Sequence, residues 1–511
     1  MSDNNQRIVR NTGLLYIRSV LCFALSLVSS RLILRALGIE DYGIYNAVGG
    51  FVSMFWMVAS VLTSAVSRFL NVEMGRNNMD GIKEVFSVSL NMMFLLALLA
   101  ALLAEGGGIW FLTKKMSIPP ERMIAATWVF HLSIFTMVIS FITIPYDAAQ
   151  LMHEAMGITA FINIAQAILT LGIALLLCYR TSNSDNLILY AILTTVSTVI
   201  IRVGDILYTR HRFQECRFRL ILKTKKLKEM LGFAWWNFIG SVAGTFSGQG
   251  VNMALNVYQG PILNTARGLA NTVNNAVSML VYNFNLSIKP QIMQSYARED
   301  RSRVNSLVFT GTKFSSYLMM LFMIPLAIET PFVLKIWLVD FPDYTIPFVR
   351  LALLASFIYG IDTHFITAKM ADGKIVWYQI ITSAIVFLTF PLSTLALHAG
   401  YDPLWIYYAL LVTSFAKSIV TIVSVKPVLD FKYKDCVFRI LTPILLVGLL
   451  SCSISLAVYH VIAEGWLRFI AVGFISVICT IGSSLYVGCT KEERNLLLGL
   501  VREKKRSRRS L

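Results

Sequence analysis

No charged side chain interrupts the segment VFSVSLNMMFLLALLAALLA, residues Val85–Ala104. A helix of about 20 apolar residues crosses the roughly 30 Å hydrocarbon core of a lipid bilayer. Thirteen further windows of similar length and composition recur along the 511 residues. The sequence therefore predicts an all-α polytopic membrane protein with about 14 transmembrane helices. The other windows are 12–34, 43–66, 124–144, 157–178, 187–208, 233–257, 264–288, 312–334, 346–368, 375–397, 404–425, 438–461 and 469–489.

The overall composition excludes several other classes of protein. Hydrophobic residues make up 56% of the chain and charged residues only 14%, whereas about 25% of the residues of a soluble domain are charged. An intrinsically disordered chain is also excluded, because such chains have a low content of hydrophobic residues. The seven cysteines include no C-x-x-C pair, so we expect no disulfide framework, metal site or redox pair. The first apolar window is too long for a cleavable signal, so we expect it to remain as a membrane helix.

The net charge of +17 is concentrated in connections that fall on one side of the predicted membrane. Most of the 45 Lys and Arg residues lie in the set of alternate connections that contains both termini. The positive-inside rule then places both termini in the cytoplasm. Segments 209–232 and 490–511 are the most basic, and we expect them to contact anionic lipid headgroups. A role in nucleic-acid binding is disfavoured, because no aromatic-rich basic domain accompanies these charges.

A weak internal repeat suggests how the helices are grouped. A shift of 222 residues places Gly38 on Gly260 and Arg76 on Arg298, although a chance match is the alternative. Because each copy holds six helices, the second enters the membrane in the same orientation as the first, which makes the repeat parallel. The predicted organisation is an N-terminal lobe over 1–208, a basic cytoplasmic linker over 209–232, a C-terminal lobe over 233–427, an additional helix pair over 428–489 and a basic tail over 490–511.

Polar side chains recur every three or four residues along three predicted helices, which places them on one helical face. Such a face cannot contact hydrocarbon, so we expect it to line a water-filled pathway. Tight packing between helices is the alternative, especially for the Ser and Gly positions. The candidate lining residues are Asn46 and Ser53 in window 43–66, Asn237 and Asn252 in window 233–257, and Asn271, Asn274, Ser278 and Tyr282 in window 264–288.

Charged residues inside a membrane cost at least about 2.5 kcal/mol each, so each calls for an explanation. Arg18, Arg31 and Arg267 are our candidates for a cationic cavity, with snorkelling to the membrane surface as the alternative for Arg18. A guanidinium matches phosphate oxygens, so this cavity would suit a diphosphate or an acidic sugar.

Other charged groups near the predicted helices are harder to assign. Arg202 and Asp205 are three residues apart and form either a structural ion pair or a coupling site. Asp147 is expected in a solvated loop, and the roles of Asp362 and Lys417 are left open.

Three strings in the chain resemble loop signatures of one transporter superfamily. They are LGIEDYGIYNAVGG at Leu37–Gly50, SRFLNVEMGR at Ser67–Arg76 and IPYDAAQLMHEAM at Ile144–Met156. The superfamily is that of the multidrug, oligosaccharidyl-lipid and polysaccharide (MOP) exporters, which includes the MATE transporters, and the resemblance is to its Wzx-type O-antigen and polysaccharide flippases. It extends to the architecture of two six-helix lobes with an additional C-terminal pair.

The resemblance implies a function as well as a fold. It implies a flippase that moves an undecaprenyl-diphosphate-linked oligosaccharide across the bacterial inner membrane by alternating access, with Arg18, Arg31 and Arg267 in regions that match the family's cationic cavity. The polysaccharide polymerase machinery is an implied partner. No cofactor is expected, and coupling to H⁺ or Na⁺ is left open. The second predicted helix departs from the family pattern because it contains no arginine.

Three alternatives are kept. A lipid II-type flippase is a near relative, and a cation-coupled multidrug exporter shares the fold, although the first helix lacks the buried carboxylate that such an exporter needs. A membrane glycosyltransferase or polymerase is more distant, because the predicted outer loops are short and the longest is only 105–123. We therefore expect a transporter and not an enzyme.

Overall fold

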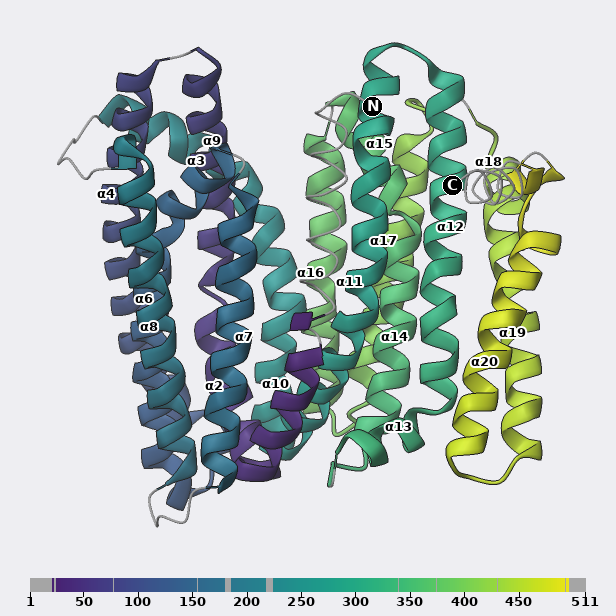
Figure 1. Ribbon diagram of the computed structural model, residues 1–511, viewed down its shortest axis with the longest axis horizontal. Coiled ribbons are helices and arrows are strands. Elements are labelled where there is room, and N and C mark those ends of the chain that lie inside the picture. Colours follow the sequence, from purple (N-terminus) through teal and green to yellow (C-terminus); the bar gives the residue numbers. More distant parts are fainter. Residues whose placement is uncertain are drawn as a thin grey trace, which may run out of the picture. The chain divides into compact units, whose positions relative to one another are not determined.

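The computed structural model describes residues 21–22, 24–76, 78–153, 155–179, 185–216, 224–338, 340–373, 375–429, 431–491 and 493–495. Within these ranges the chain forms helices and turns and contains no strand (Figure 1). All fourteen predicted windows are helical over their described residues, apart from single residues at some ends and breaks at Met54–Phe55, Glu329 and Asp362. The all-α prediction is confirmed.

The helices follow one another with short connections. A first helix covers described residues of 21–37. The next group is α2 (Ile39–Ser53), α3 (Trp56–Gly75), α4 (Met79–Leu103), α5 (Ile109–Lys114), α6 (Met123–Met152), α7 (Met156–Tyr179) and α8 (Asn186–Arg212). The later group is α9 (Thr224–Thr245), α10 (Val251–Gln259), α11 (Pro261–Ala297), α12 (Arg301–Ile328), α13 (Thr330–Trp337), α14 (Thr345–Ile361), α15 (Thr363–Asp372), α16 (Val376–His398), α17 (Trp405–Val425), α18 (Tyr433–Cys436), α19 (Thr442–Val461) and α20 (Trp466–Ser483).

Four π-helical turns join some of these elements into longer helices. In a π-turn the backbone widens by one residue, and such turns are frequent at functional sites. They are η1 (Ala104–Gly108) between α4 and α5, η4 (Phe246–Gly250) between α9 and α10, η5 (Val437–Leu441) between α18 and α19, and η6 (Ser484–Gly488) after α20.

Ten of the described helices are long and apolar enough to span a membrane, or up to eleven if α2 and α3 form one bent span. Windows 233–257 and 264–288 are helical but are not among them. These windows carry the Asn-rich stripes, which lower the mean hydropathy of α9 to α11. The chain is therefore a multi-pass membrane protein in which some membrane-length helices are too polar to face lipid on all sides.

The described helices form two compact units, each with its own core. Unit 1 comprises residues up to 269 together with 337–345 and 383–409, and unit 2 comprises the rest. This partition follows backbone contacts, and the two-lobe organisation derived from the sequence stays a prediction.

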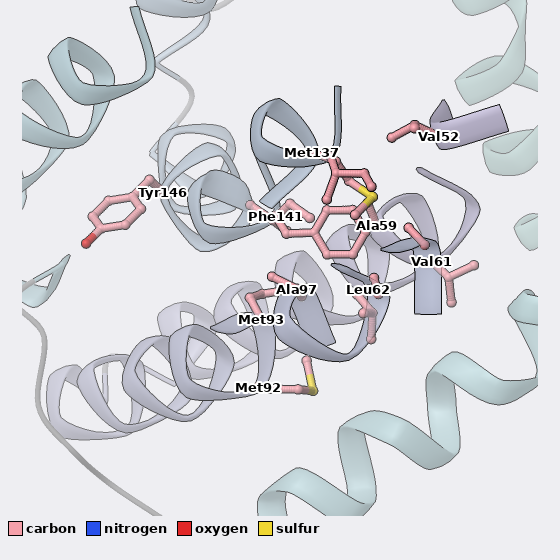
Figure 2. Packing of buried hydrophobic residues seen from close by; sticks show 14 of the residues in the cluster. Val52, Ala59, Val61, Leu62, Met92, Met93, Ala97, Met137, Phe141 and Tyr146 are labelled. Carbon is pink, nitrogen blue, oxygen red and sulfur yellow. The ribbon is translucent and has the colours of Figure 1, made fainter. Parts of the chain in front are cut away.

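The core of unit 1 is built mainly from α2, α3, α4, α6 and α8. Apolar side chains spaced at helical intervals face one another across these helices and exclude both lipid and water. Figure 2 shows the sulfur of Met137 and the ring of Phe141 from α6 among Leu62 of α3 and Ala97 of α4.

The core of unit 2 gathers side chains from α11, α12, α15, α17, α19 and α20. The last two helices lie side by side as a hairpin at the yellow end of the chain (Figure 1). Ion pairs at both ends tie this hairpin to α12: Arg468 donates to both carboxylate oxygens of Glu329 at 2.9 and 3.2 Å, and Lys313 lies 2.6 Å from Glu493. The additional helix pair is therefore an integral part of unit 2.

Local geometry at two points matches the 222-residue repeat. Gly38 and Gly260 share one conformation, with φ of 83° and 80° and ψ of 170° and −179°, and each precedes a helix. This left-handed region favours glycine, which has no Cβ. Asn78 and Asp300 are also 222 residues apart, and each caps a helix by accepting a bond at 3.0 Å from the backbone amide three residues on.

Helices α2 and α11 approach closely within unit 1. The hydroxyl of Thr265 donates to the carbonyl of Ile39 at 2.6 Å. A Cβ at Gly43 would lie 2.0 Å from the carbonyl oxygen of Pro261, so only glycine allows this approach. By contrast, a Cβ at Gly49 on the same helix would meet nothing within 4 Å.

We expect Gly43→Ala to destabilise unit 1 by about 1–3 kcal/mol, because the added methyl overlaps backbone that cannot rotate away. The matched control is Gly49→Ala, which should be neutral or stabilising by up to about 1 kcal/mol, since alanine favours the helix. Thermal unfolding of the detergent-solubilised protein measures both. Equal unfolding temperatures for the two variants would contradict the close approach.

Candidate functional site

A cleft of about 450 Å³ opens in unit 1 beside the break between α2 and α3. Its other wall is the end of α9 and the π-turn η4. Non-helical backbone at membrane depth is tolerated where it lines a water-filled space, which is consistent with a helix break at this cleft. The lining residues are Ser53, Trp56, Met57, Gly244, Thr245, Gly248 and Gln249.

A second cavity of about 240 Å³ shares Ser53 and Trp56 with the cleft. Threonine hydroxyls from α6 and α8 line it, and Thr136 donates to Thr195 at 3.3 Å. Ser53 donates to the carbonyl of Gly50 at 2.7 Å, one of the acceptors that the end of α2 leaves available. The predicted polar face of window 43–66 therefore borders two adjoining cavities through Ser53.

Arg267 of α11 is buried next to the same π-turn. Its side chain is only 8% exposed, and its Nη2 donates to the carbonyl of Gly248 at 3.1 Å. The hydroxyl of Tyr407 in α17 also contacts the guanidinium. Within the part of the chain that the structure describes, Arg267 forms no ion pair, and its Nη1 has no hydrogen-bond partner. The site thus holds a buried cation whose charge no described carboxylate neutralises.

The other two candidate arginines differ in their placement. Arg31 and Arg35 line a cavity of about 310 Å³ together with Gly38 and Asp340. Both guanidinium groups are exposed, so this cavity presents cationic donors at the end of unit 1 where α2 begins. Arg18 lies outside the described residues.

Two of the candidate lining residues lie near Arg267 in unit 1. Asn46 packs against α11, where a Cβ at Gly268 would lie 3.2 Å from its amide nitrogen. Likewise, a Cβ at Gly50 of α2 would lie 3.0 Å from the amide nitrogen of Asn252. Asn46 thus lies between α2 and α11, and Asn252 between α10 and α2, and their lining of a water-filled pathway stays a prediction. The side chain of Asn237 lies outside the described part.

The remaining stripe residues belong to the part of α11 in unit 2. Asn271 is exposed, Ser278 is partly buried and Tyr282 is 60% exposed. Asn274 is partly buried, and its Oδ1 has no hydrogen-bond partner. This amide oxygen is therefore both buried and unsatisfied, which is unfavourable in a membrane-length helix.

The Arg202 and Asp205 pair is only part of a larger cluster. Their closest approach is 3.9 Å, whereas Arg202 lies 3.4 Å from Asp147 of α6. The expectation that Asp147 occupies a solvated loop is wrong, because α6 continues through Pro145 to Met152. Asp205 is 2% exposed, and its Oδ1 accepts a hydrogen bond from Gln150. Arg202 therefore interacts with two carboxylates, Asp147 of α6 and Asp205 of α8.

A second arginine cluster joins three helices of unit 1. Arg122 donates to Asp41 through Nε and Nη2 and to Asp185 through Nη1 and Nη2, at distances of 2.5–3.1 Å. Asp185 also caps α8. Burial tends to raise the pKa of Asp185, but the hydrogen bonds from Arg122 and from the first amides of α8 outweigh burial and lower it. Nothing in the sequence spacing indicated this cluster, since its members lie 81 and 63 residues apart.

Comparisons with known proteins bear on this site and its scaffold. The family described as "Polysaccharide biosynthesis protein" matches residues 8–289, more than half of the chain. A comparison with curated protein sequences found no match to this chain.

Three solved structures share the fold. A lipid II flippase MurJ in an inward closed conformation matches with a TM-score of 0.69 and 13% identity over 93% of this chain and 98% of its own. An inward-facing multidrug resistance MATE transporter of the MOP superfamily matches with a TM-score of 0.63 and 11% identity over 80% and 94%. A MOP superfamily transporter from Pyrococcus furiosus, described as having a binding pocket of reverse polarity, matches with a TM-score of 0.58 and 10% identity over 82% and 95%.

We expect Arg122→Lys to lower the stability of unit 1 by about 1 kcal/mol or more, because an ammonium cannot reproduce four hydrogen bonds to two carboxylates. Arg122→Ala should cost more, since it also leaves Asp41 and Asp185 facing each other without a cation. Thermal unfolding measures both effects. The control is Arg212→Lys at the exposed end of α8. A shift as large for this control would show that the effect does not come from the cluster.

Proposed function

Because this chain belongs to the polysaccharide biosynthesis protein family, we propose that it flips an undecaprenyl-diphosphate-linked oligosaccharide across the bacterial inner membrane. The cargo is an O-antigen repeat unit or a capsular or exopolysaccharide unit. The observation that carries this proposal is the buried guanidinium of Arg267, which has no ion-pair partner among the described residues. A cation buried in this way is suited to an anionic cargo.

The chemistry at Arg267 supports a diphosphate in particular. In the structure its guanidinium donates to the carbonyl of Gly248, which is a neutral acceptor. Charge-assisted hydrogen bonds to phosphate are about twice as strong as bonds to neutral groups. A diphosphate that entered the neighbouring cleft would therefore compete favourably for the same donors. The adjoining hydroxyl-lined cavity offers hydrogen bonds to sugar.

The fold supports transport by alternating access. The solved relatives include a lipid II flippase and multidrug transporters, and their shared architecture is compatible with both lipid-linked and free substrates. We favour the lipid-linked oligosaccharide over an organic cation, because Arg267 would repel a cationic drug. A lipid II-type flippase is the second candidate, since its cargo carries the same diphosphate. In either case the protein would act as a transporter and not as an enzyme.

The orientation follows from the distribution of charge. We place both termini in the cytoplasm, with segments 209–232 and 490–511 against anionic lipids. The connection after the first helix, at Gly38, then lies on the periplasmic side. Arg31 and Arg18 would extend the cationic path along the first helix, and the polymerase machinery would receive the cargo outside. Coupling to H⁺ or Na⁺ would drive the cycle, and the Arg202 and Asp205 cluster is one candidate for it.

We expect Arg267→Ala to abolish surface polysaccharide while the protein still reaches the membrane. Arg267→Lys should reduce export by about tenfold or more, because the ammonium keeps the charge but loses the planar fork. Surface glycan staining and membrane immunoblotting measure the two properties. The control is Arg439→Ala, whose side chain is 70% exposed. Normal surface glycan in Arg267→Ala cells would refute the assigned site.

Deletion of the gene should distinguish the two candidate cargoes. For an O-antigen or capsular cargo, cells should survive, lose surface glycan and accumulate the lipid-linked repeat unit in the inner membrane. For a lipid II cargo, deletion should be lethal, because the cell wall could not be completed. Mass spectrometry of extracted lipids provides the measurement. Survival with unchanged glycan but increased drug sensitivity would favour a multidrug exporter.

A further inference from the structure

A buried carboxylate occupies a helix break in unit 2. Helix α14 ends at Ile361 and α15 begins at Thr363, so Asp362 is the break in a 28-residue apolar span. Its side chain is 0% exposed. With a rise of about 1.5 Å per residue, it lies about 15 Å from the Asp372 end of the span. An ionisable residue at such a depth is conspicuous, because the bilayer disfavours charge there.

Lys417 of α17 is the partner of this carboxylate. Its Nζ lies 3.1 Å from Oδ1 of Asp362, and its side chain is 4% exposed. The same ammonium lies 3.7 Å from the centre of the Tyr359 ring, a distance that allows a cation–π interaction. The lysine therefore has a second favourable contact, which persists if the carboxylate becomes neutral.

The second oxygen of Asp362 is left without a hydrogen bond. Thr421 lies beside the carboxyl group, and its hydroxyl donates to the carbonyl of Lys417 at 2.9 Å. The hydroxyl of Tyr378, at 3.3 Å from the oxygen of Thr421, must then be the donor of that pair. A hydroxyl oxygen accepts up to two bonds, so Thr421 retains one acceptor position beside the carboxyl group.

Glu329, another buried acid of unit 2, differs from Asp362 in the hydrogen bonds to its carboxylate oxygens. Glu329 also lies at a helix break, between α12 and α13, and is 1% exposed. Both of its carboxylate oxygens accept hydrogen bonds from Arg468. Each oxygen of Glu329 is therefore already hydrogen-bonded. Asp362 has a monodentate partner instead and keeps one oxygen available.

The remaining groups around Asp362 decide which ligand it would take. Helix α17 presents Lys417 and Thr421, α16 presents Tyr378, and α14 presents Tyr359. His364 follows in α15, where it packs against α12 at Gly311. No cluster of three His, Cys, Asp or Glu suited to a metal occurs in the described ranges. An adjacent ammonium also repels Na⁺, whereas a proton needs only one lone pair.

We propose that Asp362 and Lys417 form a proton-binding site in unit 2. The proton adds to Oδ2 of Asp362 and converts the carboxylate into a neutral carboxyl group, which donates to the free acceptor position of Thr421. The ion pair with Lys417 is lost, and the ammonium stays charged over the Tyr359 ring. Release of the proton restores the pair. Proton binding itself is independent of the cargo, and only its use as a driving force rests on the proposed flippase function.

Infrared difference spectroscopy of the purified full-length protein in lipid nanodiscs tests this site directly. Acidification should produce the carbonyl band of a protonated carboxyl group and the uptake of about one proton by this site. Asp362→Asn should remove the band and that proton, and Asp362→Glu should shift the band. A band that persists unchanged in Asp362→Asn would overturn the proposal, and so would its loss in Asp205→Asn with Asp362 intact.

Two neutralised pairs separate proton binding from a purely structural role. Asp362→Asn with Lys417→Met removes both charges, so it should fold with nearly the original unfolding temperature but lack the band. Glu329→Gln with Arg468→Met is the matched control and should keep the band, as should His364→Gln. If the Asp362→Asn single variant fails to fold, the neutral pair provides the decisive spectrum, and retention of the band there would overturn the proposal.

The same spectra keep this proposal distinct from the flippase function. Arg267→Ala should retain the Asp362 band even if it abolishes export, because Arg267 belongs to another site. If the cargo assignment is wrong, Arg267→Ala cells will have normal surface glycan. The spectroscopic test of Asp362 does not depend on that outcome. For the driving role, the neutral pair should reduce polysaccharide export and make the residual export insensitive to a protonophore. Full, protonophore-sensitive export in that variant would refute the driving role.

Discussion

The constraint on which this structure depends is that polar groups at membrane depth must find partners inside the protein, because lipid offers none. This constraint explains why charged residues that are far apart in sequence meet on facing helices. Arg122 gathers two carboxylates in unit 1, and Arg468 binds Glu329 across 139 residues in unit 2. The Arg468 and Glu329 pair is buried, so its separation would leave a buried charge uncompensated, whereas the Arg122 cluster is partly exposed.

Against this background, Arg267 and Asp362 stand out for opposite reasons. Arg267 is a buried cation that pairs with neutral acceptors, and Asp362 is a buried carboxylate with one oxygen unused. A protein selected only for stability would replace such groups or complete their pairing, because a partly satisfied polar network is less favourable than an apolar one. In our proposals each group instead serves a ligand that binds and leaves, an anion at Arg267 and a proton at Asp362.

The helices could be predicted from the sequence because hydropathy and polar periodicity are local properties. The windows all fall on helices, although some helices extend well beyond them, as α11 does to Ala297, and Asn46 of α2 packs against α11 at Gly268. The partners could not be predicted, because pairing depends on which helices pack together. Asp147 illustrates this: it was expected in a loop after window 124–144, but α6 continues to Met152, and Asp147 lies 3.4 Å from Arg202, which is 55 residues away.

Irregular helix geometry coincides with these unusual groups. The cleft lies at the α2 and α3 break, Arg267 binds a carbonyl of the π-turn η4, and Asp362 is the break between α14 and α15. A regular helix consumes its own backbone acceptors, so it has none to offer a ligand or a buried cation. A break or a π-turn releases them at membrane depth, where each one interacts strongly because water does not compete. Thus the departure from ideal helix geometry at η4 supplies the carbonyl acceptor that holds the buried guanidinium of Arg267.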